Sequence, residues 1–453
     1  MPNRSGQATI GLIGLFFFVF LFLVLIFLKI PLNISLAVIL GAVIFCIAFI
    51  NTDLALIILI FSMLLSPQFA TGQVTGRAVK IRADDIFIIV VFLGWMAKLA
   101  VNKEMGLLRP TPLNAPIAVY IIICLFSSTV AIFQNRLGVK TSFFYLLKYI
   151  EYFMLFFMVI NNLRSMEQAK KFIFFLFLTC FLVSIYGIFE ARATGRAAAP
   201  FEIEGQETNT FAGYLVFLMS LIIGSLLYPR SRASIMPLLI TLGVAASAFL
   251  MTLSRSGWAG FIVAFAALVL LNKKYRIHLI AVFLLTAMIL PILAPESVHR
   301  RIKETFAGPA KYKILGKKLA IDESGQARID SWKIGFMRWT KRPFIGYGVP
   351  AGVVIDNQYT RVLNETGIFG MVSFMWLLFT MFMVAWRTKV LTEDDNFCQA
   401  VTIGFLAGFA GLLLLGTTAA VFIIIRIMEP FWFVLAIVTV LPDLLEEGGA
   451  VNA

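Results

Sequence analysis

The sequence is poor in charged residues, histidine and cysteine. Charged residues make up 14% of the 453 positions and apolar residues 60%, whereas soluble domains carry about 25% charged and about 45–50% apolar residues. A soluble globular protein is therefore excluded. The four cysteines have no Cys-x-x-Cys spacing, so neither a zinc site nor a disulfide framework is indicated. His278 and His299 have no partner pattern and no P-loop is visible, so we expect neither a metal nor another cofactor.

Long apolar runs stand where charges are missing. Runs of roughly 17–25 apolar residues can cross the hydrocarbon core of a bilayer as α-helices. They predict an all-α polytopic membrane protein with about 12–14 transmembrane helices. The first helix is expected to be retained, because no small-residue cleavage site follows Leu28. The predicted helices cover residues 9–28, 32–50, 53–65, 83–101, 115–133, 143–161, 169–189, 209–228, 235–252, 257–272, 278–294, 368–386, 399–416 and 418–441.

The lysines and arginines of the short loops predict the orientation of these helices. Cytoplasmic loops carry an excess of both residues, and the richer loops fall on the side of the N-terminus. Counting helices from there places residues of about 295–358 on the outer face of the membrane. We therefore divide the chain into a helical bundle at 1–294, an outer loop with candidate site residues at 295–358 and C-terminal helices at 359–453. All three parts are expected to form one integrated membrane domain.

A net charge of +14 narrows the expected partners. The basic residues lie in loops between membrane spans, where they can meet lipid headgroups or a bound substrate. Anionic membrane lipids and an anionic substrate are therefore expected, and nucleic acid is not.

The segment from Arg328 to Gly370 is long and polar for so apolar a chain. Arg328, Arg338 and Arg342 are interleaved with aromatic residues, among them Trp332. Guanidinium groups bind phosphate oxygens in a bidentate manner, and aromatic rings can stack on sugars. The spacing of Arg328 and Trp332 puts both on one face of a helix. The alternative is a solvated loop that touches anionic headgroups.

A second basic point is Arg255, in the turn Thr252–Trp258 between two apolar helices. An arginine at the membrane edge can simply extend its side chain to water. Alternatively it points into an outward-facing cavity and binds phosphate. Ser254, Ser256 and the N-terminus of the following helix would then add hydrogen-bond donors.

The third element is the entry into the helix at 368–386. Asp356 is expected to cap a helix on which Asn357, Arg361 and Glu365 share a face. Polar groups entering an apolar helix are costly unless they are satisfied or used. Asp356 is the nearest candidate for a general base, and capping alone is the alternative interpretation.

Weaker polar signals lie elsewhere. Lys148 and Glu151 are expected to form a buried ion pair. The run Arg82–Asp85 is interpreted mainly as a capped helix start. An acidic outer segment is formed by Glu202, Glu204 and Glu207 with Asn209 and Thr210, and it can bind an acceptor or cap the next helix.

Together these motifs resemble the superfamily of O-antigen ligases and O-antigen or exopolysaccharide polymerases of bacterial inner membranes. The resemblance rests on the turn SRSGW, the Arg-x-x-x-Trp spacing, the stretch PFIGYG and the entry DNQYTRVLNETGIFG, in that order. It covers roughly residues 200–390. It implies a GT-C-like helical enzyme of the inner membrane, with a periplasmic active site and no metal. Such enzymes transfer a glycan from undecaprenyl diphosphate to an acceptor hydroxyl.

The resemblance also implies roles for particular residues. Arg255 and Arg328 match the arginines that would hold the diphosphate leaving group. Asp356 stands where ligases present a histidine as the base, and Glu365 or the substrate itself is the alternative base. This departure shifts weight from a lipopolysaccharide ligase to a polymerase or to a ligase with an unusual acceptor. The acceptor is lipid A–core in ligases and another lipid-linked repeat unit in polymerases. Substrate contacts are expected from Trp332, Arg338, Arg342, Asn357, Gln358, Tyr359, Arg361 and Glu365.

Two non-enzymatic functions are the alternatives. One is a transporter for a lipid-linked glycan, for which broken helices in matched halves would be expected. The other is a membrane scaffold that gathers other polysaccharide-assembly proteins.

Overall fold

The computed structural model describes residues 32–451 except 75–76, 102–108, 202–206, 294, 306–309, 315–316, 321–322 and 354. The helix predicted at 9–28 and the acidic residues Glu202 and Glu204 lie outside the described residues. The long helices of the described part are α2 (Leu32–Ile50), α3 (Thr52–Leu65), α4 (Ala83–Val101), α5 (Asn114–Phe133), α6 (Val139–Asn162), α7 (Met166–Thr194), α8 (Thr208–Leu227), α9 (Arg232–Met251), α10 (Arg255–Leu271), α11 (Arg276–Leu293), α14 (Gln358–Leu391), α15 (Asn396–Leu415) and α16 (Ile425–Val451).

These helices confirm an all-α polytopic membrane protein. In the described part of the chain, eight helices are long and apolar enough to cross a membrane, and four further apolar helices are shorter. The short elements are β1 (Gln68–Val74), β2 (Arg77–Arg82), α12 (Glu296–Thr305), β3 (Ala310–Ile314), β4 (Lys317–Ala320), α13 (Glu323–Lys341) and the 3-10 turn η1 (Val421–Ile423). The strands form two small antiparallel hairpins, β1–β2 and β3–β4, that connect helices.

Two helices begin four or more residues earlier than hydropathy predicts. α6 begins at Val139 rather than 143, and α14 at Gln358 rather than 368. Both starts contain buried polar side chains that neighbouring segments satisfy: the Ser142 hydroxyl donates to the Val349 carbonyl at 2.8 Å. A hydropathy pattern cannot recognise such turns as helical. Conversely, α16 begins only at Ile425 rather than 418, after the turn η1.

The helix α13 replaces much of the predicted outer loop. Arg328 and Trp332 both lie on it, which confirms their helical spacing. α13 packs against the start of α14, where the Asn364 side-chain amide donates to the Gly335 carbonyl at 2.6 Å. The segment 343–348 then binds back to α14, since the N–H groups of Tyr347 and Gly348 donate to the carbonyls of Asn364 and Glu365, each at 2.8 Å.

The centre of the molecule is formed by α8, α10, α15 and α16. Small residues allow their close approach: a side chain added at Gly404 of α15 would place its Cβ 2.7 Å from Leu221 Cα of α8. Close packing at small residues is typical of helices in membranes, where dispersion forces rather than water exclusion drive association.

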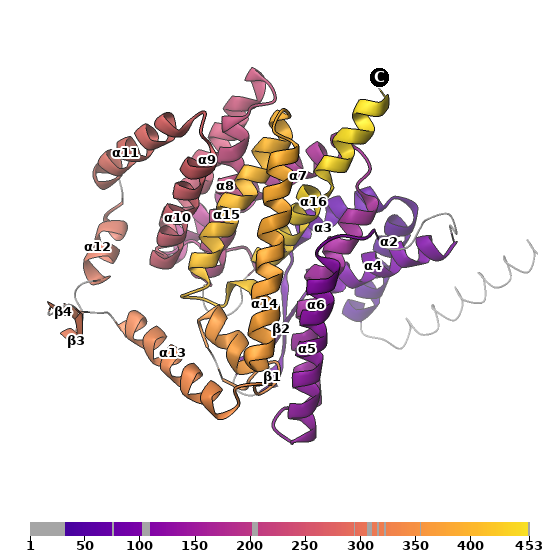
Figure 1. The fold of residues 1–453 in the computed structure, drawn as a ribbon, viewed down its shortest axis with the longest axis vertical. Helices are drawn as coiled ribbons and strands as arrows, with labels where there is room; N and C mark the ends of the chain where they lie inside the picture. The colour runs from indigo at the N-terminus through magenta and orange to yellow at the C-terminus, as the bar shows by residue number, and fades with distance from the viewer. Residues whose placement is uncertain are drawn as a thin grey trace, which may run out of the picture.

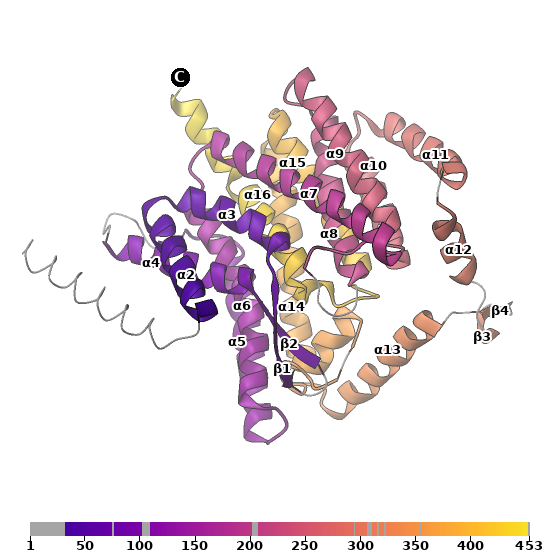
Figure 2. The ribbon, with the colours of Figure 1, turned by 180° about the vertical axis from the view of Figure 1, so that it is seen from behind.

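The helices alternate in direction. The connections α10–α11 and α14–α15 lie at one end of the bundle, and the turn α5–α6 and helix α13 lie toward the other (Figure 1). Helices α11, α12 and α13 follow an arc along one edge in both views. Seen from behind, α3 and α7 lie side by side and cross the bundle obliquely (Figure 2). The loops predicted to share one side of the membrane therefore meet at one end.

Candidate active site: a basic cavity at the helix ends

A cavity of about 800 Å³ opens where these loops meet. Its walls come from the starts of helices and from the connections before them. They include the start of α8, the turn before α10, the first half of α13, the entry and first turn of α14, and the connection between α15 and α16. The lining residues outside these helix starts are Gln68, Arg82, Phe144, Tyr145, Lys148, Arg196 and Arg301.

Positive charge dominates the cavity wall. Eight of its lining side chains are cationic, against the two acids Glu207 and Asp356. The cations are Arg82, Lys148, Arg196, Arg255, Arg301, Arg328, Arg361 and Arg426. The helices α4, α8, α10, α14 and α16 also begin at or next to this wall, so the positive ends of their dipoles point toward it. Both features favour an anionic ligand.

The turn before α10 fixes Arg255 at the cavity. The Ser254 hydroxyl accepts a hydrogen bond from the Gly257 N–H at 3.2 Å and donates to Asn209 Oδ1 at 2.6 Å. Leu253 adopts a left-handed conformation with φ of 53°, which makes the turn tight. Arg255 is the first residue of the helix and lines the cavity. Of the two interpretations of Arg255, the structure supports the one that places it in a cavity.

Arg196, which the sequence analysis missed, lies beside Arg255. Its guanidinium donates to the Thr252 carbonyl at 3.1 Å and 3.0 Å. Burial lowers the pKa of Arg196, and the nearby charges of Arg301 and Arg255 lower it further. Three arginines from three separate segments therefore gather at one point of the wall. Like charges held together in this way are typical of a site built for an anion.

Arg328 and Asp356 face the cavity from α13 and from the entry to α14. The Asp356 N–H donates to the Ser331 hydroxyl at 3.2 Å, which ties the two segments together. The prediction that Asp356 caps the helix is wrong. Asn357 is the N-cap, and its side chain accepts from the Thr360 N–H at 2.8 Å. Asp356 lies one residue further out and lines the cavity.

Asn357, Gln358 and Tyr359 contact the end of α15 and the connection between α15 and α16. The Asn357 amide donates to the Thr417 carbonyl at 2.7 Å, and the Tyr359 hydroxyl donates to the Leu413 carbonyl at 2.8 Å. The Gln358 side-chain oxygen accepts from the Phe422 N–H at 3.0 Å. These three residues do not line the cavity. They fix the start of α14, and their role as substrate contacts stays a prediction.

Arg361 and Glu365 share a face of α14, as expected. Arg361 Nε and Glu365 Oε1 are 2.7 Å apart, and the Tyr149 hydroxyl donates to Glu365 Oε2 at 3.0 Å. Arg361 lines the cavity, whereas Glu365 lies behind it. The pair holds one guanidinium at the wall.

Trp332, Arg338 and Arg342 do not line the cavity. The guanidinium carbons of Arg338 and Arg342 lie 4.4 Å and 5.3 Å from the centroid of the Tyr347 ring. Arg338 also donates to the Ala351 carbonyl at 2.8 Å, and Arg342 to Gln134 Oε1 at 3.0 Å. Both arginines therefore anchor α13 and the segment after it. Substrate contact by these three residues stays a prediction.

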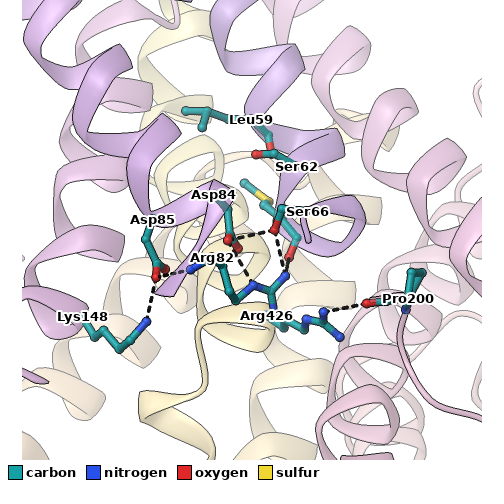
Figure 3. Close-up of polar contacts among 10 residues, drawn as sticks. Leu59, Ser62, Ser66, Arg82, Asp84, Asp85, Lys148, Pro200 and Arg426 are labelled. Atoms are coloured by element: carbon teal, nitrogen blue, oxygen red, sulfur yellow. Dashed lines mark hydrogen bonds and ion pairs between the residues drawn. The ribbon is translucent and has the colours of Figure 1, made fainter. Parts of the chain in front are cut away.

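Arg82, Lys148 and Arg426 line one part of the wall, which we call the deep wall because Arg82 and Arg426 are almost fully buried. Figure 3 shows the polar contacts of these residues. Arg82 is 5% exposed, and its Nε lies 3.0 Å from Asp84 Oδ1. Asp85 accepts from the Arg82 N–H at 2.9 Å, so the predicted capping of α4 is confirmed. Lys148 pairs with Asp85 at 2.9 Å rather than with Glu151, so that predicted ion pair is wrong. The reason is that α4 packs directly beside α6, which the sequence could not show.

Arg426 completes this deep wall from α16. Its guanidinium donates to the Pro200 carbonyl at 2.7 Å (Figure 3). Arg426 and Glu429 are charged residues within an apolar span, which is by itself a sign of function. That sign was present in the sequence and was missed.

Comparison with known proteins agrees with this geometry. Residues 240–375 match the protein family described as O-antigen ligase. No curated protein matches the chain significantly. The matched segment contains Arg255, Arg328, Asp356 and Arg361, which the fold brings to one cavity. This match over residues 240–375 supports the superfamily of O-antigen ligases and polymerases.

Proposed function

We propose that this membrane enzyme transfers a glycan from undecaprenyl diphosphate to an acceptor hydroxyl. The observation that carries the proposal is the cavity wall of eight cations, which suits a diphosphate. Arginine binds phosphate oxygens through two parallel N–H groups, and seven of the eight cations are arginines.

The transfer can be written with the residues at the cavity. The acceptor oxygen forms a bond to the anomeric carbon of the donor sugar, and the bond from that carbon to the diphosphate oxygen breaks. The hydroxyl proton passes to Asp356, which we assign as general base. Negative charge grows on the diphosphate as it leaves. Arg255 and Arg328 are assigned to stabilise that charge.

The orientation in the membrane belongs to the same proposal. The end of the bundle opposite the cavity carries Arg164, Arg230 and Lys273 in short connections and Arg387 near the end of α14. An excess of such residues marks the cytoplasmic side. We therefore place the cavity on the periplasmic side of a bacterial inner membrane.

A polymerase is the second candidate, and Asp356 favours it. Histidine stands at this place in the ligases that the sequence resembles, whereas Asp356 lines the cavity here. The acceptor would then be another lipid-linked repeat unit in place of lipid A–core. Loss of all surface glycan on gene deletion would indicate a ligase, and loss of chain length alone a polymerase.

The test uses purified full-length protein with a lipid-diphosphate glycan and an acceptor. Wild type is expected to form product, and Arg255→Ala and Arg328→Ala are expected to lose it. Arg387→Ala, an exposed residue at the opposite end, is the matched control and should behave as wild type. Reactions with and without EDTA test whether a divalent ion is also needed. Full activity in both folded cavity variants would overturn the proposal.

A further inference from the structure

Four carboxylic acids lie buried behind the deep wall of the cavity. Asp84 and Asp85 belong to α4, Glu151 to α6 and Glu429 to α16, and none is more than 5% exposed. The transfer proposed above assigns no role to any of them. Ionisable groups within membrane spans are expensive, so a cluster drawn from three helices calls for a functional explanation.

Ion pairs account for two of the four acids. Asp84 is bonded to Arg82 at 3.0 Å and Asp85 to Lys148 at 2.9 Å (Figure 3). The Ser66 hydroxyl donates a further hydrogen bond to Asp84 at 2.8 Å. Both cations line the cavity, so these two acids are connected directly to its wall.

Glu151 is the first candidate for a protonated acid. It is 1% exposed, and its Oε2 atom has no hydrogen-bond partner among the described residues. Lys148, one turn earlier on the same helix, is bonded to Asp85 at 2.9 Å instead. Burial without such a partner disfavours the ionised carboxylate and favours the protonated acid.

Glu429 is the second candidate for a protonated acid. It is 0% exposed, and neither carboxyl oxygen has a hydrogen-bond partner among the described residues. Burying an ionised carboxylate without hydrogen bonds costs several kcal/mol, whereas a protonated one costs far less. The charged and titratable groups around the two glutamates are Arg82, Asp84 and Asp85 of the α4 entry, Lys148 and Tyr152 of α6, and Arg426 of α16.

The two protons change the net charge of the cavity. Eight cations line the cavity, together with the acids Glu207 and Asp356. Three further acids, Asp84, Asp85 and Glu365, are bonded to these cations. With all five acids ionised, the cavity has a net charge of three positive charges. Ionisation of Glu151 and Glu429 would leave only one. A diphosphate carries at least about two negative charges. Protonated glutamates therefore match the cavity to such an anion, and ionised glutamates do not.

We propose that Glu151 and Glu429 form a proton-binding site that is coupled to anion binding in the cavity. Anion affinity is high while both glutamates hold protons, and it falls as rising pH removes them. By linkage, a bound anion in turn increases proton affinity at the pair. Among the described residues, no group of three or more His, Cys, Asp and Glu side chains is arranged to hold a metal ion, so the proton is the cation assigned here. The identity of the anion rests on the proposed function, whereas the proton site itself does not.

The experiment is calorimetry of farnesyl diphosphate binding to the purified full chain in nanodiscs. Titrations in two buffers of different ionisation enthalpy count the protons taken up on binding. As the pH rises, the affinity of wild type for farnesyl diphosphate is expected to fall by up to about tenfold per pH unit for each linked proton. Within that pH range, wild type is expected to take up protons when it binds the ligand. Glu429→Gln and Glu151→Gln mimic the protonated acids and should bind with less uptake and a flatter pH dependence. Glu447→Gln, an exposed residue of α16, is the matched control and should resemble wild type.

The outcomes separate the two proposals. Binding without proton uptake, or with uptake unchanged in both glutamine variants, overturns the coupling and leaves the proposed function standing. No binding at any pH overturns both the assigned anion and the coupling. Infrared spectra of the unliganded protein then test the proton site alone. A carboxylic acid band present in wild type and reduced in Glu429→Gln supports it, and identical spectra refute it.

Discussion

The Arg361–Glu365 pair offers a test that separates the stability of the bundle from the chemistry of the cavity. The two side chains are 2.7 Å apart and buried, and Tyr149 also donates to Glu365. Removing one member of a buried pair leaves an uncompensated charge and costs about 3–5 kcal/mol. Arg361→Met and Glu365→Leu should each lower stability by about this amount. The double variant should lose much less, because apolar side chains of similar volume can replace a buried pair.

The assay is thermal unfolding in one detergent at one scan rate. The change in Tm per kcal/mol falls as a chain lengthens and is about 1–2 °C for 453 residues, so each single variant should lose about 3–10 °C in Tm. The double variant should unfold near the wild-type temperature and yet be inactive, because it lacks a guanidinium at the cavity wall. If the two single losses simply add in the double variant, the pair is not coupled and the reasoning fails. A folded, fully active double variant would refute the role of Arg361.

Three further predictions follow from the same structure. Arg255→Ala and Arg328→Ala should each lower kcat by about 10²–10³-fold, the usual loss for one group that stabilises the charge of a leaving group. Arg255→Lys should keep only part of the wild-type rate, because lysine cannot bind phosphate in a bidentate manner. Single-turnover kinetics would measure both effects. Asp356→Asn should lower the rate by about 10²–10⁴-fold while donor binding persists, and an unchanged rate would remove Asp356 as the base. Gly404→Val should destabilise the bundle by about 1–3 kcal/mol, because an added Cβ would lie 2.7 Å from Leu221 Cα. Gly243→Ala, with nothing within 4 Å of the added atom, is its control and should stabilise α9 by about 0.5–1 kcal/mol.

Hydropathy was a good guide to the helices because each one must hide its own backbone polar groups from lipid. The helix α4 begins at Ala83 and ends at Val101, as the apolar run predicts. The guide failed where polar turns are satisfied by partners distant in sequence. Ser142 at the start of α6 is bonded to Val349, more than 200 positions away.

Local chemistry identified part of the site. Arg255 stands after a serine in a tight turn, and Arg328 stands one helical turn before Trp332. Both have distinctive neighbours, and both line the cavity. Arg196 lies in the connection after α7 and Arg301 lies on α12, and neither stands in such a motif. The arginines near them in space lie elsewhere in the chain. Only the folded chain brings their charges together.

The sequence by itself determined the class of the protein and most of the described helices, and its net charge predicted an anionic ligand. Hydrophobic length and net charge are summed properties that do not depend on which helices touch. The tertiary structure alone decided which cations meet, that Lys148 pairs with Asp85 and that Glu429 lies buried near Asp84. Electrostatic interactions fall off within several ångströms, so the charge of the cavity and its coupling to protons depend on distances across α4, α6 and α16 that no linear pattern encodes.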